Sequence, residues 1–228
     1  MRIGLLLVCT GKYDIFLQPL IDSADKYFFR HDTVTIYLFT DKHPLLIHSD
    51  RINVIIVPTE HKPFPFCTLY RYKYFTKAHP MIDADYLFYC DVDMRFVSET
   101  GREILGDIVC VQHPGFYKGG WGSENCDGKS NAYLEKKYRN DYKAGGFQGG
   151  KKEKYLSACA VMSNLITDDE SRGIMAEWHD ETFWNWYLKT MAENVKILDP
   201  SYCYPESWKL PFSKKILALN KNHVEIRK

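Results

Sequence analysis

Short apolar runs alternate with helical patterns along this chain of 228 residues, and this alternation limits the possible folds more than any other feature. Several runs are apolar throughout, as in strands that are covered on both faces of a sheet. Helical patterns lie between them, at residues 16–29, 67–78 and 168–191, the last with room for more than one helix. The sequence therefore predicts one α/β domain with a central, mostly parallel sheet flanked by helices. The predicted strands are residues 2–9, 34–39, 52–57, 86–91, 108–112, 158–163 and 216–219.

Composition argues against several classes of protein. A formal net charge of +1 indicates no nucleic-acid-binding surface. The seven cysteines form no C-x-x-C pair, which argues against a zinc or redox motif and indicates a reducing compartment. The longest N-terminal apolar run, residues 3–9, is far too short to be a transmembrane segment and lacks a cleavage site. We therefore expect a soluble, cytoplasmic protein.

Two aspartates, Asp91 and Asp93, end the predicted strand 86–91. In an extended chain the side chains of residues i and i+2 point to the same side, so both carboxylates would face one point. Ligands bind at the carboxyl ends of strands in α/β sheets, and a hard divalent cation such as Mg²⁺ or Mn²⁺ prefers carboxylate oxygens. The pattern predicts a metal that receives a phosphate at the edge of the sheet.

An Asp-x-Asp pattern also has an ordinary structural explanation. Aspartate often ends strands because it favours turns, and a three-residue motif occurs often by chance. The metal-binding interpretation therefore depends on motifs elsewhere in the chain.

Four motifs occur in an order that resembles glycosyltransferase family 6, the family of the blood-group A and B transferases and of shorter bacterial enzymes. The resemblance covers nearly the whole chain. The chain resembles the catalytic domain alone, without an anchor or stem. It implies one nucleotide-sugar transferase domain of the GT-A type, residues 1–228, with a donor-nucleotide half at about 1–112 and an acceptor half at about 113–228. The motifs are Asp91-Val92-Asp93-Met94, His113-Pro114-Gly115-Phe116-Tyr117, Ala144-Gly145-Gly146-Phe147-Gln148-Gly149-Gly150 and Trp178-His179-Asp180-Glu181.

The resemblance implies a retaining α1,3-transferase that moves N-acetylgalactosamine or galactose from a UDP-sugar to a glycan containing galactose, often fucosylated. Glu181 would be the catalytic carboxylate, either as a nucleophile or as a group that stabilises developing charge. His113 and Trp178 would shape the acceptor site. The donor would contact Cys9, Thr10, Tyr13, Arg71, Asp91, Val92, Asp93, Ala144, Gly145, Gly146, Asp180, Lys221 and Arg227.

Metal and donor choice follow from the same resemblance. Some bacterial members have asparagines in place of both aspartates and work without metal, whereas this chain keeps Asp91 and Asp93 for Mn²⁺ or Mg²⁺. Gly146 matches the small residue of members that use UDP-GalNAc, so we expect that donor over UDP-Gal. The chain departs from the vertebrate pattern at Val8, Cys9 and Lys143.

Each of these residues also has a structural explanation. The glycines of Ala144-Gly145-Gly146 are also typical of a tight turn. A lone His113 before a proline is typical of a loop, and Trp178 is also typical of a packed core. The basic residues 221–228 are typical of a solvated terminus, and the glycine-rich segment 118–128 is typical of a loop able to order over a ligand.

Two other functions remain open at this point. Two acids that end a strand would also suit a metal-dependent nucleotidyltransferase, which releases pyrophosphate instead of UDP. A transferase fold without turnover would be a glycan-binding protein, although Glu181 argues against this because a binding protein needs no carboxylate at a reacting centre. The acceptor itself is not predicted by the sequence.

Overall fold

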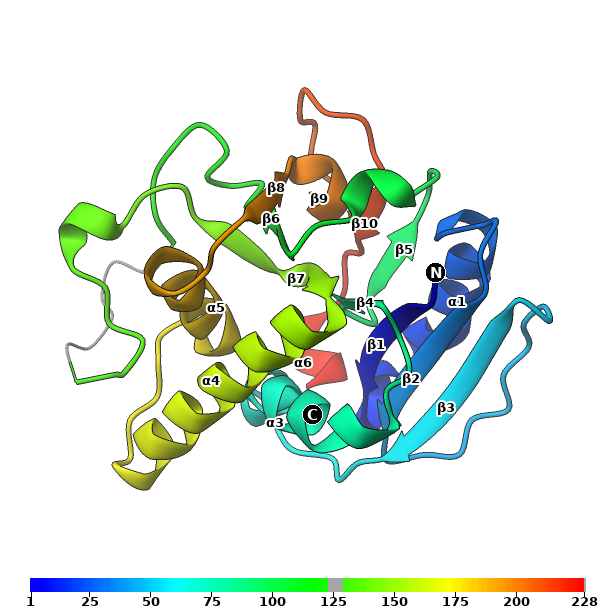
Figure 1. Ribbon diagram of the computed structural model, residues 1–228, viewed down its shortest axis with the longest axis horizontal. Helices are drawn as coiled ribbons and strands as arrows, with labels where there is room; N and C mark the ends of the chain where they lie inside the picture. Colours follow the sequence, from blue (N-terminus) through cyan, green and yellow to red (C-terminus); the bar gives the residue numbers. More distant parts are fainter. Residues whose placement is uncertain (123–128, 228) are drawn as a thin grey trace.

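The computed structural model describes residues 1–122 and 129–227 and has two sheets. The larger has seven strands in the order β3-β2-β1-β4-β7-β6-β8, and every neighbouring pair is parallel except those that involve β7. The mostly parallel α/β sheet is therefore confirmed (Figure 1). Its strands are β1 (Ile3–Cys9), β2 (Val34–Thr40), β3 (Ile52–Pro58), β4 (Tyr86–Cys90), β6 (Ile108–Gln112), β7 (Lys143–Lys151) and β8 (Val195–Leu198).

A second, three-stranded sheet lies beside the end of β4. It consists of β5 (Met94–Phe96), β10 (Ile216–Ala218) and β9 (Tyr204–Pro205), in that order. The helices are α1 (Leu17–Tyr27), α2 (Phe66–Leu69), α3 (Arg71–Ala78), α4 (Lys152–Ser171), α5 (His179–Thr190) and α6 (His223–Ile226). Short 3₁₀ helices are Gly11–Phe16, His79–Met81, Arg102–Ile104, Lys136–Tyr138 and Pro200–Cys203.

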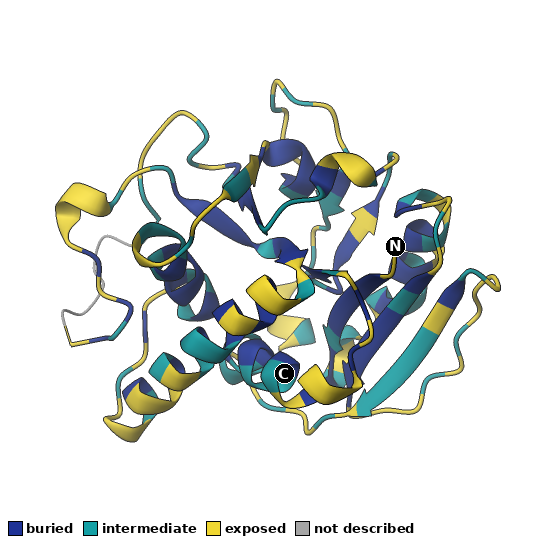
Figure 2. Ribbon diagram, in the orientation of Figure 1, coloured by how far each residue is buried: buried dark blue, intermediate teal, exposed yellow. Residues whose placement is uncertain are grey.

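Two apolar cores lie on the two faces of the large sheet. One joins α1 and the small sheet to one face, and the other joins α3, α4 and α5 to the opposite face. Alternation along β1 explains the division, since Leu5 and Leu7 belong to the first core and Leu6 to the second. Both faces are therefore covered, and the inner strands are buried along their length (Figure 2). Among the described residues, no helix combines the length and apolar character needed to cross a membrane.

Six of the seven predicted strands are confirmed within two residues at each end. The exception is 158–163, which is wrong because this segment lies inside α4. Its neighbourhood buries Tyr155, Cys159, Met162 and Ile166, at three- and four-residue spacings, so the run is the buried stripe of a long helix. A short apolar run alone does not distinguish this stripe from a buried strand.

The glycine-rich segment 144–150 is part of strand β7 and not a tight turn. Glycine is needed here because neighbouring backbone approaches closely. A Cβ on Gly149 would lie 2.2 Å from the carbonyl oxygen of Leu87, and one on Gly150 would lie 2.2 Å from that of Asp107. Of the predicted loop 118–128, residues 123–128 lie outside the described residues.

Candidate active site

The two acids after β4 are presented by a turn. Asp91 follows the strand directly, and the backbone N–H of Met94 donates a 3.1 Å hydrogen bond to the carbonyl oxygen of Asp91. The predicted extended geometry of residues 91–93 is therefore wrong. Asp91, Val92 and Asp93 nevertheless line the same pocket, with Asp91 paired to Arg71 and Asp93 paired to Lys221.

This pocket lies at the carboxyl ends of β1 and β4 and brings acidic and basic side chains together. The acids are Asp91 and Asp93, and the cations include Arg71 and Lys221. Arginine and lysine side chains are the usual protein partners of phosphate groups. Its lining residues are Val8, Thr10, Gly11, Lys12, Tyr13, His61, Phe64, Cys67, Thr68, Arg71, Tyr89, Asp91, Val92, Asp93, Lys221, Ile226 and Arg227.

The C-terminal segment forms one wall of this pocket. Lys221 makes an ion pair with Asp93, and the guanidinium carbon of Arg227 lies 3.7 Å from the ring centre of Phe64. The ammonium of Lys12 donates a 3.3 Å hydrogen bond to the carbonyl oxygen of Glu225, which ties α6 to the end of β1. Burial lowers the pKa of Lys221. Lys221 and Arg227 therefore line the pocket, with Lys221 half-buried and Arg227 exposed.

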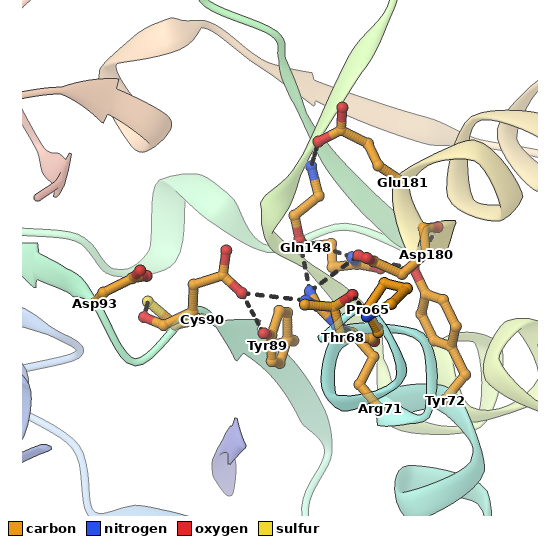
Figure 3. Close-up of polar contacts among 12 residues, drawn as sticks. Pro65, Thr68, Arg71, Tyr72, Tyr89, Cys90, Asp93, Gln148, Asp180 and Glu181 are labelled. Carbon is orange, nitrogen blue, oxygen red and sulfur yellow. Dashed lines mark hydrogen bonds and ion pairs between the residues drawn. The ribbon is translucent and has the colours of Figure 1, made fainter. Parts of the chain in front are cut away.

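Arg71, at the start of α3, connects the pocket to a second acidic pair. It is 3% exposed, with Nη2 3.3 Å from Asp91 Oδ1 and Nη1 3.3 Å from Asp180 Oδ2. Its guanidinium carbon lies 4.2 Å from the ring centre of Tyr89, whose hydroxyl donates a hydrogen bond to Asp91. Figure 3 shows Arg71 between Tyr89 and Asp180. One buried cation thus holds carboxylates from two distant parts of the chain.

Asp180 and Glu181 lie in the first turn of α5, and Trp178 is its N-cap. Burial raises the pKa of Asp180, while the charge of Arg71 opposes this rise. Burial also raises the pKa of Glu181, to about 7. Glu181 Oε2 accepts a 2.7 Å hydrogen bond from the backbone N–H of Gly145. A carboxyl group that titrates near neutral pH in a buried site is typical of catalytic acids and bases.

The segment Ala144-Gly145-Gly146 lies beside both acidic pairs. A Cβ on Gly145 would lie 3.2 Å from Asp180 Oδ2 and 3.3 Å from Glu181 Oε2. A Cβ on Gly146 would lie 3.0 Å from Asp91 Oδ2. Side chains at these two positions would therefore occupy the space between the acids.

His113 and Trp178 do not line the pocket. The ring centre of His113 lies 4.9 Å from that of Phe116, and burial lowers its pKa to about 4. Trp178 is 52% exposed, and its indole N–H donates to the carbonyl oxygen of Gly122. The exposed indole is available to a ligand, whereas the core explanation of Trp178 is wrong.

Three residues at or near the pocket differ from what the sequence predicted. Cys9 is 1% exposed and its side chain belongs to the core, so it does not line the pocket. Tyr89 was not predicted, although its place two residues before Asp91 in a strand was a usable signal. His61 was not predicted either, and no sequence pattern marks it. Its Nδ1 lies 3.1 Å from Thr10 Oγ1 in the pocket wall.

Asp91 and Asp93 fit a metal ion whose coordination is completed by a bound substrate. The described residues contain no group of three or more His, Cys, Asp or Glu side chains placed to hold a metal. Magnesium, however, is commonly bound by one or two carboxylates together with substrate phosphates and waters. Two carboxylates in a pocket with basic side chains match that pattern.

The sequence model named "Glycosyltransferase family 6" matches residues 1–228. The chain belongs to glycosyltransferase family 6. The resemblance of the four motifs is therefore confirmed, and so is the α/β fold that it implies.

Known members of glycosyltransferase family 6 are similar over nearly the full chain. The "Histo-blood group ABO system transferase 1" of Rattus norvegicus is 29% identical over 238 residues, which cover 99% of this chain and 68% of the relative. "Globoside alpha-1,3-N-acetylgalactosaminyltransferase 1" of Gallus gallus is 26% identical, covering 100% of this chain and 69% of the relative. The "O-antigen biosynthesis glycosyltransferase WbnI" of Escherichia coli is 25% identical, covering 97% and 95%. Membership implies a nucleotide-sugar donor and a glycan acceptor.

Proposed function

We propose that this family 6 member is a retaining α1,3-glycosyltransferase that moves N-acetylgalactosamine, or galactose, from a UDP-sugar to a galactose-containing, fucosylated glycan. The observation that carries this proposal is the continuous contact from Asp91 through Arg71 to Asp180, with Glu181 beside it. This contact supports the proposal because it joins a pocket that contains basic side chains to the carboxyl groups of Asp180 and Glu181. A sugar bound at this junction would have its leaving group on one side and Glu181 on the other.

The nucleotide and diphosphate would occupy the pocket. Thr10 and Tyr13 line its wall after β1 and would contact the uridine. Cys9 would contribute only backbone, since its side chain lies in the core. Lys221 and Arg227 would bind the diphosphate, a role that suits a point charge and a fork of donors.

Asp91 and Asp93 would hold Mn²⁺ or Mg²⁺ against the diphosphate, with Val92 between them in the turn. A bound metal supplies Lewis-acid stabilisation of the charge that develops on a leaving diphosphate. In the structure Asp93 pairs with Lys221 and Asp91 with Arg71. A bound metal would therefore share these carboxylates with the two cations.

The transfer step breaks the bond between the anomeric carbon and the diphosphate oxygen, and UDP leaves with the electron pair. Glu181 would either attack that carbon or stabilise its positive charge while the acceptor hydroxyl attacks. Asp180 and Arg71 would hold donor-sugar hydroxyls. The acceptor oxygen then forms the new bond to the anomeric carbon, and its proton passes to the departing diphosphate oxygen.

Donor and acceptor choice would depend on different residues. Gly146, together with Ala144 and Gly145, would leave space for the acetamido group of UDP-GalNAc. His113 and the exposed indole of Trp178 would contact the acceptor, since an aromatic face beside a carboxylate suits a sugar.

The test is the release of UDP from UDP-GalNAc and from UDP-Gal, each with Mn²⁺ or EDTA and with 2′-fucosyllactose as acceptor. We expect acceptor-stimulated, Mn²⁺-dependent UDP release that is faster with UDP-GalNAc. NMR of the product would show the α1,3 linkage. An α-linked product formed only from UDP-Gal would assign UDP-Gal as the donor in place of UDP-GalNAc. A β-linked product would contradict the retaining reaction.

A further inference from the structure

Strand β7 extends past the end of its neighbour β4. The register pairs Cys90, the last residue of β4, with Phe147, so residues 143–145 have no partner strand on that edge. The other edge is paired, since Lys143 lies opposite Gln112 of β6. Buried backbone N–H and C=O groups nearly always have hydrogen-bond partners. The unpaired edge of β7 therefore needs partners from another element.

Asn185 on α5 supplies two of these partners. Its Oδ1 accepts a 2.8 Å hydrogen bond from the backbone N–H of Lys143, and its Nδ2 donates a 2.8 Å hydrogen bond to the Lys143 carbonyl oxygen. Nδ2 also donates a 2.9 Å bond to the carbonyl oxygen of Glu181, one turn earlier in α5. Asn185 is 1% exposed. The amide thus makes the same pair of bonds that a residue in a neighbouring strand would make.

Glu181 makes the next contact along the same edge. Its Oε2 accepts from the backbone N–H of Gly145, two residues after Lys143. Residues i and i+4 of a helix are about 6 Å apart along its axis, and alternate residues of a strand are about 6.7 Å apart. Glu181 and Asn185 therefore match the spacing of Gly145 and Lys143.

We propose that Asn185 is a positioning residue: with Glu181 it takes the place of a missing strand and fixes the donor-selecting segment against the catalytic carboxylate. The expected effects on kcat and on donor choice rest on the proposed function, whereas the contact between Asn185 and Lys143 does not. It makes donor choice at residues 144–146 and placement of the Glu181 carboxylate depend on one buried side chain. Asn185 is 1% exposed and its amide bonds only to backbone groups, so it would act through the residues that it holds.

Asparagine suits this position because its amide has both a donor and an acceptor. Aspartate would keep an acceptor for the Lys143 N–H but would place a negative charge beside two carbonyl oxygens. Leucine has nearly the same shape and would leave the backbone groups of Lys143 without partners. These two substitutions separate loss of the donor from loss of the whole contact.

The experiment compares Asn185→Leu and Asn185→Asp with Asn131→Leu. Asn131 is a matched control, because its side chain also donates to a backbone carbonyl, that of Leu165. It lies in a turn that contacts α4 and does not line the pocket. Three quantities are measured in each full-length variant: hydrogen exchange of the Lys143 and Gly145 amides by NMR, kcat with each donor, and Kd for UDP.

In Asn185→Leu we expect the amides of Lys143 and Gly145 to exchange about fivefold to tenfold faster, as for loss of one buried hydrogen bond. We expect kcat to fall about 10- to 100-fold, because small misplacement of a reacting group has effects of this size. Kd for UDP should stay within about twofold, and the ratio of kcat for the two donors should move toward one. Asn185→Asp, which keeps one contact, should lie between wild type and Asn185→Leu.

Unchanged exchange at Lys143 in both Asn185 variants would overturn the proposal. So would faster exchange accompanied by a loss of kcat no larger than that of Asn131→Leu, since Asn185 would then be structural only. If Asn185→Leu does not fold, Asn185→Asp decides by kcat and by the donor ratio, because it keeps the acceptor for the Lys143 N–H and loses only the bonds that Nδ2 donates. Wild-type values of both in Asn185→Asp would then overturn the proposal. Failure of the proposed function is distinct, because the wild type would then release no UDP while the exchange measurement still reports on the contact.

Discussion

Glu181 accepts its 2.7 Å hydrogen bond from the backbone N–H of Gly145, so the candidate catalytic carboxylate is bound to the segment proposed to choose the donor. A backbone donor fixes the carboxylate oxygen without adding a competing charge. The rest of the carboxyl group is held in a buried environment that raises its pKa. The chemistry of Glu181 and the shape of the donor site are therefore linked by direct contact.

Replacing Glu181 by glutamine should remove turnover and preserve nucleotide binding. We expect kcat to fall by about 10²–10³-fold or more, because a group that stabilises charge at the reacting centre is lost. Kd for UDP should be unchanged, since Glu181 does not line the nucleotide pocket. Steady-state kinetics and calorimetry measure the two effects. Glu103→Gln, remote from the site and paired with Lys215, is the control and should keep wild-type kcat; equal loss in both variants would contradict the assignment.

The raised pKa of Glu181, about 7, predicts opposite pH effects on activity and stability. If the carboxylate is the active form, kcat/KM should fall as the pH drops through about 7. For stability, a carboxyl whose folded pKa lies above its unfolded value of 4.5 binds protons better when folded. The free energy of unfolding should therefore fall as pH rises from about 4.5 to about 7.

Glu181→Gln should remove this part of the pH dependence of stability. It should unfold with a free energy roughly 1–3 kcal/mol higher than wild type at pH 8, because no charge is then buried. Urea denaturation at pH 5 and pH 8 measures the difference. An identical pH dependence in the two proteins would show that Glu181 ionises normally.

Arg71 should be needed for both folding and catalysis. Arg71→Ala leaves Asp91 and Asp180 without their shared cation, and loss of one partner of a buried ion pair costs about 3–5 kcal/mol. Arg71→Lys keeps the charge but loses the fork that reaches both carboxylates. We expect Arg71→Lys to fold with kcat reduced at least about tenfold, because Asp91 and Asp180 are no longer held together.

The matched control for Arg71→Lys is Arg172→Lys, which changes an ion pair with Asp168 and Asp169 on α4. Thermal unfolding and kcat are measured for both. Wild-type activity in Arg71→Lys would mean that the charge alone is sufficient and that the two contacts are not both required.

Gly146 and Gly149 should respond differently to a single added methyl group. In Gly146→Ala the Cβ lies 3.0 Å from Asp91 Oδ2, a carboxylate at the pocket edge that can move slightly. We expect a folded enzyme with lower kcat for UDP-GalNAc and a relative gain for UDP-Gal, because the new methyl occupies space proposed for the acetamido group.

In Gly149→Ala the Cβ would lie 2.2 Å from the backbone oxygen of Leu87, inside the sheet, where no side chain can yield. This variant should not fold under conditions where Gly146→Ala does. Circular dichroism and the two donor assays compare them. A folded Gly149→Ala, or a Gly146→Ala with unchanged donor ratio, would contradict the geometry or the donor assignment respectively.

Removal of divalent metal should abolish transfer and weaken UDP binding. With EDTA the carboxylates of Asp91 and Asp93 would face the diphosphate without an intervening divalent cation. We expect Mn²⁺ to restore activity and to tighten UDP binding, measured by calorimetry. Asp93→Asn should lose the Mn²⁺ effect, whereas Asp199→Asn, which changes a carboxylate that caps Pro200–Cys203, should keep it. UDP affinity that is the same in EDTA and Mn²⁺ would contradict a metal at this pair.

The sequence by itself determined the class of fold, most strands of the large sheet and the family. Apolar runs such as 34–39 and 108–112 are stable only as inner strands whose two faces are covered. The local pattern and the tertiary structure therefore agree at these segments. Asp91, Glu181 and Gly145 could be proposed as site residues because they belong to motifs whose residue types and order resemble those of the family.

Only the tertiary structure decided how these residues meet. Strand β7 was not predicted, because glycine has a low preference for strands. Glycine is required there because the backbone of Leu87 and Asp107 approaches closely, which no local sequence pattern indicates. Segment 158–163 has an apolar run of strand length, yet packing places it in α4.

The contacts of Arg71 with Asp91 and Asp180, and of Asn185 with Lys143, join residues that are far apart in the chain. Their geometry depends on where helices α3 and α5 pack against the sheet. A local sequence pattern specifies which side of an element a residue faces, whereas packing of whole elements specifies what it faces.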